Sequence, residues 1–363
     1  MLQRRALGTF DWVLVAAMAV ATGLGLLMLY SATRLSGGGL FQRQVMWLAV
    51  AAVVFVITVA VDYRFWAGLA VPAYALCCGL LLLVLISARA ISGSRSWFEL
   101  GFFNLQPAEA AKLATILMLA RYVEEKKGFG LSSRSLMMLV GIVGLPVFLI
   151  AAQPDLGSSL PFLPLLFVVV VLSGIRWKLL MILGLVAALM IPMVYFGGVL
   201  KPYQKERVLT FLDPLSDPQG AGWQVLQSRI AVGSGGLWGR GLLQGSQGQL
   251  EFLPESHTDF IMSVMAEEIG FAGAACALIV YFVLFSRIVA AARSARDRLG
   301  AYIAMGVAAV LCSQAILNIG VILGLMPTTG VPLPLMSYGG SSLVTTYAAL
   351  GLVLNVRMRC LVN

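Results

Sequence analysis

Charged residues are scarce in this sequence. Only 11% of the 363 residues are Asp, Glu, Lys or Arg, whereas 60% are hydrophobic. Soluble domains are about 25% charged and about 45–50% apolar, so this chain has too little polar surface to cover its apolar side chains in water. The composition excludes a soluble globular domain and indicates an integral membrane protein.

Residues that bind metals or form disulfides are equally scarce. His257 is the only histidine, and the five cysteines form no CxxC pair. This pattern predicts neither a disulfide framework nor a zinc site. The sequence also lacks the GxxxxGK[ST] pattern of a P-loop and the SxxK nucleophile motif of penicillin-binding proteins. We therefore expect no nucleotide cofactor, no ATP-driven transport and no crosslinking chemistry in this chain.

Long apolar runs, in contrast, dominate the chain. A membrane helix needs about 20 apolar residues, and only helices with such patterns satisfy their backbone in lipid. Ten runs of this kind lie at about 11–33, 43–61, 66–88, 108–124, 136–152, 158–173, 176–196, 258–287, 298–325 and 338–356. The sequence predicts an all-α polytopic membrane protein with about ten transmembrane helices, forming one domain over residues 1–363.

The net charge of +9 is spread over short loops rather than gathered into one basic patch, so no nucleic-acid partner is expected. Fifteen of the 25 Lys and Arg residues fall on the side of the predicted topology that holds the N-terminus, against four in the opposite short loops. Positive residues favour the cytoplasmic side of a membrane. An even number of spans then predicts that both termini are cytoplasmic.

The connection between the seventh and eighth predicted helices, about 197–257, is unusually long and lies on the outer face. Long loops without a domain of their own are usually functional or disordered. Apolar side chains such as Trp223 and Trp238 would let this loop lie on the membrane or fold back on the helices. Its glycine run, 233–241, is compatible with a phosphate-binding nest or with a flexible loop.

Two polar clusters interrupt the apolar runs near the outer side. Glu109 and Lys112 stand three residues apart at the start of a predicted helix, where they can pair. The pair either locks the bundle as a neutral unit or faces a substrate. Asp155, in the break 153–159, either caps the following helix or binds a cation or a sugar hydroxyl.

The stretch LPESHTDFIMSVMAEEIG, residues 253–270, holds Glu255, His257, Asp259, Glu267 and Glu268 where the long loop enters a helix. Ser256 and Asp259 have the spacing of a capping box, which would explain one acid but not the others. On a continuous helix Asp259 and Glu267 share a face, about 12 Å apart along the axis. A carboxylate at an outer cavity suits a general base, with His257 as an orienting partner rather than a metal ligand.

A proline- and glycine-rich element, PTTGVPLPLMSYGGSS at 327–342, predicts a rigid re-entrant turn that lines a cavity. Together with NLQPAEAAKL (104–113), QPDLGSSL (153–160), YQKERVLTFLDP (203–214) and the acidic stretch, it resembles the shape, elongation, division and sporulation (SEDS) family. The similarity covers essentially the whole chain. The loop that precedes the acidic motif is more similar to the elongation branch, RodA, than to the division branch.

The resemblance implies a peptidoglycan glycosyltransferase of the bacterial cytoplasmic (inner) membrane. Such an enzyme polymerises lipid II, a disaccharide pentapeptide on undecaprenyl diphosphate, into β-1,4 glycan strands during cell elongation and cell-shape maintenance. Asp259 matches the essential aspartate of the family and is the expected general base. The residues expected to bind the substrate are Arg95, Trp97, Glu109, Lys112, Asp155, Lys205, Arg207, Glu255 and His257.

The resemblance also implies partners, namely a class B penicillin-binding protein that crosslinks the strands and other membrane proteins of the elongation complex. A Mg²⁺ or Mn²⁺ ion at the diphosphate would offset the charge of the leaving group, although no ligand spacing in the sequence indicates one. Two alternatives stay open. A lipid II flippase would need charges deep on both sides of a cavity, and a non-catalytic scaffold that activates a penicillin-binding protein would tolerate replacement of Asp259.

Overall fold

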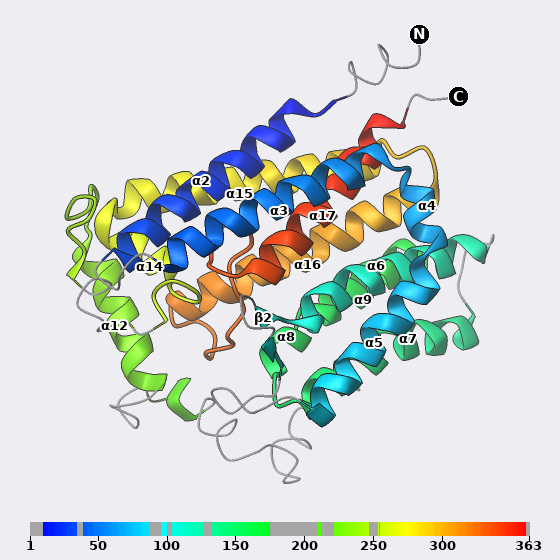
Figure 1. The fold of residues 1–363 in the computed structure, drawn as a ribbon, viewed down its shortest axis with the longest axis horizontal. Coiled ribbons are helices and arrows are strands. Elements are labelled where there is room, and N and C mark those ends of the chain that lie inside the picture. The colour runs from blue at the N-terminus through cyan, green and yellow to red at the C-terminus, as the bar shows by residue number, and fades with distance from the viewer. Residues whose placement is uncertain are drawn as a thin grey trace.

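Helices that run side by side make up nearly all of the structure, a computed structural model (Figure 1). It describes residues 10–34, 39–87, 96–99, 104–126, 132–174, 209–211, 213, 221–246, 253 and 255–360. Strands β1 (Phe98–Glu99) and β2 (Asn104–Leu105) form a short antiparallel ribbon. The predicted all-α architecture is confirmed.

Nine of the ten predicted apolar runs contain helix. The tenth run, 176–196, lies outside the described residues. The helices are α2 (Trp12–Thr33), α3 (Gly39–Ala60), α4 (Tyr63–Gly68), α5 (Ala70–Ser87), α6 (Pro107–Glu125), α7 (Ser133–Ala152), α8 (Leu156–Ser159), α9 (Phe162–Leu172), α12 (Ala221–Ser234), α14 (Ile261–Glu268), α15 (Gly270–Arg293), α16 (Arg298–Ile322) and α17 (Gly340–Met358). The run predicted at 66–88 is divided at Leu69 into α4 and α5.

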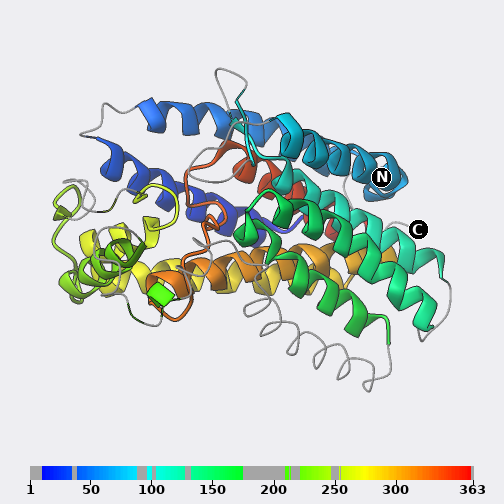
Figure 2. The same ribbon diagram turned by 90° about the horizontal axis from the view of Figure 1, so that it is seen from below.

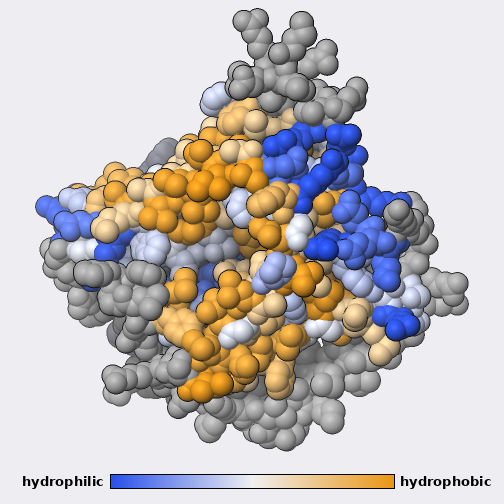
Figure 3. All heavy atoms as spheres, turned by 45° about the vertical axis from the view of Figure 1, so that its right-hand side comes forward, coloured by the Kyte–Doolittle hydropathy of each residue, from blue (hydrophilic) through white to orange (hydrophobic). Residues whose placement is uncertain are grey.

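Large apolar side chains cover the outside of the bundle. Phe148 is 70% exposed and Phe282 is 74% exposed, and Figure 3 shows broad apolar areas over the helices with hydrophilic side chains gathered in patches. Among the described helices, α2, α3, α7, α15 and α16 are long and apolar enough to cross a membrane. These surfaces would be unfavourable in water and suit lipid, so the chain is a multi-pass membrane protein.

Helix α16 is the central element, because it packs against α6, α9, α15 and α17.

Aspartate side chains cap the starts of several helices. Asp11 accepts a hydrogen bond from the Leu14 N–H at 3.1 Å at the start of α2, and Asp297 accepts one from the Gly300 N–H at 2.9 Å at the start of α16. Such N-caps satisfy amides that have no partner within the helix.

The helix predicted at 258–287 is not continuous, and this prediction is wrong. The chain divides at Gly270, whose φ of +78° favours glycine, into α14 and α15. The cause lies in the glycine run of the long loop. A Cβ at Gly270 would lie 2.3 Å from the Gly239 nitrogen, and a Cβ at Gly235 would lie 1.8 Å from the Ala266 carbonyl oxygen. Backbone packs directly on backbone here.

The long loop folds back on the helices over its described part. Helix α12 packs against α14 (Figures 1 and 2). Further along the loop, the Ser246 N–H donates to the carboxylate of Glu267 on α14 at 2.8 Å. The Arg240 and Gly241 N–H groups donate to the carbonyls of Glu267 and Glu268 at 2.9 and 3.0 Å. The glycine run is therefore packed against protein, and neither of these two amides is available to a phosphate.

Helix α2 begins and α17 ends at the same end of the bundle, which we call the terminus end (Figure 1). This placement agrees with an even number of spans. The opposite end, the site end, holds α12, α14 and the non-helical connection 324–339. Which end faces the cytoplasm stays a prediction.

Candidate functional site

Asp259 lies in a turn, residues 255–260, that precedes α14. The turn is organised around the Glu255 carbonyl, which accepts hydrogen bonds from the N–H groups of Thr258, Asp259 and Phe260 at 3.2 to 3.3 Å. Helix α14 begins at Ile261 with Phe260 as its N-cap and no side-chain cap. The capping box predicted for Ser256 and Asp259 is therefore absent, and the half-buried Asp259 needs another explanation.

The main chain of this turn is hydrogen-bonded by residues of α16 and of the connection that follows α16. Each of the three consecutive carbonyls of residues 257–259 accepts a hydrogen bond from α16 or from the connection between α16 and α17. The donors, in the order of the carbonyls, are Tyr338 N at 2.9 Å, Ser337 Oγ at 2.5 Å and Asn318 Nδ2 at 2.9 Å. The position of Asp259 is thus set by residues distant in sequence.

The connection 324–339 is itself fixed on several sides. The buried Tyr281 hydroxyl on α15 donates to the Pro334 carbonyl at 2.5 Å, and the Gln44 amide on α3 bonds to both Ser337 O and Gly339 N. Leu335 has a φ of +69°, a conformation that costs free energy and persists only where its surroundings impose it. The predicted rigid turn is consistent with this geometry.

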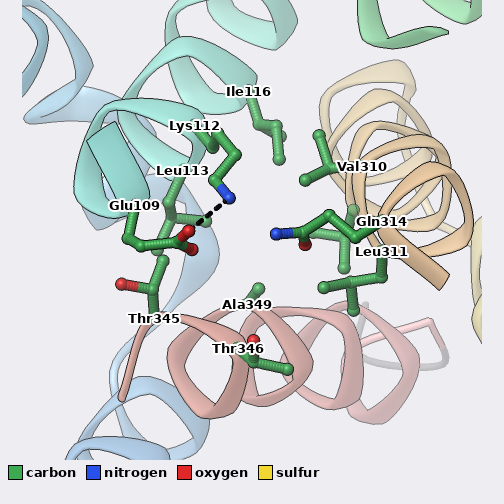
Figure 4. A pocket seen from close by; sticks show the side chains of 11 residues that line it. Glu109, Lys112, Leu113, Ile116, Val310, Leu311, Gln314, Thr345, Thr346 and Ala349 are labelled. Carbon is green, nitrogen blue, oxygen red and sulfur yellow. Dashed lines mark hydrogen bonds and ion pairs between the residues drawn. The ribbon is translucent and has the colours of Figure 1, made fainter. Parts of the chain in front are cut away.

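Glu109 and Lys112 form a buried ion pair at the start of α6. Their charged atoms are 2.7 Å apart, and each side chain is only 4% exposed. The pair lines a small pocket between α6, α16 and α17 (Figure 4). Both predicted roles are compatible with this arrangement, since the two charges neutralise each other and also border a cavity.

Gln314 on α16 projects into the same pocket. Its amide nitrogen points toward Glu109 and Lys112 (Figure 4) and has no hydrogen-bond partner among the described residues, although Gln314 is only 2% exposed. An unsatisfied buried donor costs about 1–3 kcal/mol. Such a donor, next to an ammonium group, suits an anionic oxygen supplied by a ligand.

Gln314 and Asn318 were not predicted from the sequence. They stand four residues apart on α16, which places them on one face with an axial separation of about 6 Å. Gln314 faces the pocket and Asn318 faces the turn that holds Asp259. The available signal was the presence of two amides in an otherwise apolar membrane helix, where polar side chains are rare and usually functional.

Asp155 caps α8, as one of its two predicted roles required. Its carboxylate accepts hydrogen bonds from Ser158 N at 3.2 Å, from Ser158 Oγ at 2.8 Å and from Gln106 Nε2 at 3.2 Å. Both oxygens are therefore engaged within the protein. Binding of a cation or a sugar by Asp155 stays a prediction.

Glu267 and Glu268 are fully buried but face the long loop. Glu267 accepts hydrogen bonds from the N–H and hydroxyl of Ser246, and Glu268 accepts them from Leu243 N and Ser31 Oγ. Because Asp259 lies in the turn that precedes α14, it shares no helix face with Glu267, and the predicted common face does not exist. These two acids fasten the loop.

Three of the remaining predicted site residues are described by the structure. Glu255 is exposed and His257 half-buried in the Asp259 turn, and Trp97 is half-buried beside β1. Burial holds the pKa of His257 below its ordinary value, although the nearby Glu255 opposes this shift. His257 is therefore neutral at pH 7, which suits a hydrogen-bonding role. Arg95, Lys205 and Arg207 lie outside the described residues.

The fold and these groups define a polytopic membrane protein with a charged, partly unsatisfied pocket and a rigidly held acidic turn. The family model FtsW/RodA/SpoVE, described as cell cycle protein, matches residues 11–360. The chain belongs to this family, as its sequence motifs predicted.

Named relatives agree with this assignment. The chain is 40% identical to peptidoglycan glycosyltransferase MrdB of Escherichia coli over 320 residues, which cover 88% of this chain and 85% of the relative. A chain from a solved peptidoglycan synthase complex, described as coordinating polymerization and crosslinking, is 39% identical with a TM-score of 0.83, covering 98% and 99% of the two chains. Rod shape determining protein RodA of Thermus thermophilus is 34% identical with a TM-score of 0.73, covering 98% of each.

Proposed function

We propose that this peptidoglycan glycosyltransferase polymerises lipid II into β-1,4 glycan strands, with Asp259 as the general base. The observation that carries the proposal is the buried Glu109–Lys112 pair beside the Gln314 amide nitrogen, which has no hydrogen-bond partner in the described part of the chain. An ammonium group and a free N–H donor in one pocket can together bind diphosphate oxygens. The enzyme class follows from the family and from the names of the relatives.

The reaction needs a proton acceptor at the attacking hydroxyl. In the proposed step, the sugar 4-hydroxyl of one lipid II attacks the anomeric carbon of the growing strand, and the hydroxyl proton passes to the Asp259 carboxylate. The bond between the anomeric carbon and the diphosphate breaks, and undecaprenyl diphosphate leaves with inversion. A half-buried carboxylate on a fixed main chain is suited to this task, because a general base must lie within hydrogen-bond distance of the proton.

Lys112 would stabilise the charge of the leaving diphosphate as a point charge. Its partner Glu109 keeps the ammonium group oriented at 2.7 Å and neutralises it when the pocket holds no anion. Glu255, His257, Asp155, Trp97, Arg95, Lys205 and Arg207 are the further residues proposed to contact the substrate.

A Mg²⁺ or Mn²⁺ ion at the diphosphate stays a prediction. Within the described ranges, no three His, Cys, Asp or Glu side chains gather closely enough to form a metal site. The protein groups described here do not fit a resident ion, so no step above depends on one. Mg²⁺ is often held mainly by substrate phosphates and one or two carboxylates.

The proposed partner is a class B penicillin-binding protein that crosslinks the strands, within the elongation complex of the bacterial inner membrane. The synthase complex that this chain resembles supports a crosslinking partner, because its description joins polymerization with crosslinking. Both chain termini are proposed to be cytoplasmic, since the positive residues of the short loops concentrate on that side.

Gel analysis of strands made from labelled lipid II tests the proposal. The purified chain with its class B partner is expected to make long strands, and Asp259→Ala is expected to reduce their synthesis by about 100-fold or more, the usual contribution of a general base. Co-purification of the variant with the partner serves as the control for folding.

Other results would select the alternatives. If Asp259→Ala forms strands at the native rate, Asp259 is not the base. If the native chain makes no strands but moves labelled lipid II across a vesicle membrane, the chain is a flippase. If it makes no strands yet stimulates strand synthesis by its partner, it acts as a scaffold.

A further inference from the structure

Two uncharged side chains outside the predicted site donate hydrogen bonds to the main chain at and next to Asp259. Asn318 is 2% exposed on α16, and its amide nitrogen donates to two carbonyls, those of Asp259 and Val331, each at 2.9 Å. The amide therefore ties the acidic turn and the connection 324–339 to the central helix. Because Asp259 itself contributes one of the two carbonyls, the backbone at this residue is anchored directly.

Ser337 supplies a second hydrogen bond to the turn, at Thr258, the residue before Asp259. Its hydroxyl donates to the Thr258 carbonyl at 2.5 Å, while its oxygen accepts a hydrogen bond from the Leu333 N–H at 2.9 Å. Ser337 is 5% exposed, and its own carbonyl accepts a hydrogen bond from Gln44. The hydroxyl is thus oriented from two sides and has little freedom to release the turn.

We infer that Asn318 and Ser337 are positioning residues that hold the Asp259 carboxylate where it can accept the proton of the attacking hydroxyl. This inference rests on the proposed role of Asp259. The side chain of an aspartate is short, so its carboxylate follows the backbone closely. A displacement of about 1 Å at a reacting group can cost about 100-fold in rate, and loss of either tie frees the backbone at or beside Asp259.

A purely structural role is the competing explanation, since buried amides also stabilise membrane bundles. The chain offers a matched control at the terminus end. Asn355 on α17 is 0% exposed, and its amide nitrogen donates to the carbonyls of Thr58, Val59 and Val61 at 3.1, 2.7 and 2.6 Å. Asn355 has the same chemistry as Asn318 but lies far from the acidic turn.

The experiment compares Asn318→Leu, Ser337→Ala and Asn355→Leu with the native chain and Asp259→Asn, each in complex with the class B partner. Polymerisation kcat, KM for lipid II and the midpoint of thermal unfolding are measured. We expect Asn318→Leu to lower kcat by about 10- to 100-fold with KM within about twofold, which is the signature of a lost transition-state contribution. Asn355→Leu should lower the unfolding midpoint but change kcat by less than about twofold.

Ser337→Ala removes only one oxygen and keeps the test decisive if Asn318→Leu does not accumulate. It is expected to lower kcat by about 10-fold at unchanged KM. Native kcat in Ser337→Ala or in Asn318→Leu overturns the inference, as do equal losses of kcat in Asn318→Leu and Asn355→Leu.

The Asp259→Asn variant distinguishes the proposed base role of Asp259 from the proposed positioning role of Asn318 and Ser337. If it is inactive while Asn318→Leu keeps native kcat, only the positioning role is wrong. If Asp259→Asn polymerises at the native rate, the proposed base is wrong, and positioning through Asp259 is excluded with it.

Discussion

The terminus end and the site end of the bundle use similar polar side chains in different ways. At the terminus end, each of three arginines meets an aspartate: Arg64 and Asp297 at 2.7 Å, Arg287 and Asp11 at 2.7 Å, and Arg359 and Asp62 at 3.2 Å. The buried Asn355 amide is saturated by three carbonyls and accepts a hydrogen bond from Tyr63 N.

At the site end, two buried amides are only partly satisfied. Gln314 Nε2 and Asn318 Oδ1 have no hydrogen-bond partner among the described residues. The buried ion pair there, Glu109 and Lys112, borders a pocket rather than packed side chains. The terminus end also holds an unsatisfied group, because the Trp66 indole N–H on α4 has no hydrogen-bond partner among the described residues. What distinguishes the site end is that its unsatisfied Gln314 donor and its buried ion pair border a pocket.

Breaking the buried pair should have the largest effect on stability. Lys112→Met leaves the Glu109 carboxylate buried without its partner, and we expect a loss of about 3–5 kcal/mol in the free energy of unfolding. Unfolding of the purified chain in detergent measures this loss. The control is Glu109→Gln combined with Lys112→Met, which should recover most of the stability because no charge stays buried. Equal losses in the single and double variants would contradict this account.

Most substitutions of buried residues lower the free energy of unfolding, but Gln314→Leu should not. The variant removes an unsatisfied donor, so we expect the stability to stay the same or rise by about 1 kcal/mol. The KM for lipid II should rise by about 10-fold, because a hydrogen bond to an anionic oxygen is lost. Ser313→Ala is the control, since the Ser313 hydroxyl bonds to the Val310 carbonyl of its own helix. A clear loss of stability in Gln314→Leu would refute the contrast between the two ends.

The smallest effect is expected at the terminus end. The Arg64 and Asp297 side chains are 49% and 21% exposed, so Arg64→Ala should cost less than about 1 kcal/mol. Burial alone would raise the pKa of Asp297, but hydrogen bonds from Gly300, Arg64 and Tyr63 outweigh it and hold that pKa below the ordinary 3.8. Asp297 therefore adds stability above pH 3.8 that is lost as the pH falls through its lowered pKa.

Unfolding of the native chain and Arg64→Ala at about pH 7 and about pH 3 checks this prediction. The difference in stability between them should shrink at the lower pH. A difference that grows on acidification would show that the carboxylate is not stabilised by Arg64.

The candidate site residues that the sequence could select are those whose burial in a membrane protein costs free energy. Glu109 and Lys112 are ionisable groups in an apolar run, and Asp259 lies in a dense acidic motif, so hydropathy and motif spacing were sufficient to select them. The predicted family and the all-α polytopic fold are confirmed. The helix ranges also agree to within a few residues at the two helices that Asp11 and Asp297 cap.

The division at Gly270 could not be predicted locally. Residues 271–285 are almost continuously apolar after the acidic motif, and isolated glycines such as Gly270 and Gly273 are usually tolerated within a helix. The division depends on the backbone of Gly235 and Gly239, which approaches from the long loop. Likewise, nothing in the spacing of Asn318 reveals that its amide reaches the Asp259 carbonyl, because that contact spans 59 residues.

The three ties on the acidic turn also fix the order in which the enzyme matures. Every donor to the carbonyls of residues 257–259 that the structure describes lies later in the chain, at Asn318, Ser337 and Tyr338. Because a chain is synthesised from its N-terminus and its earlier parts fold first, a nascent protein inserted as far as α15 already carries Asp259 but none of these donors. On the proposed role of Asp259, catalytic competence would therefore wait until α16 and the connection 324–339 have joined the bundle.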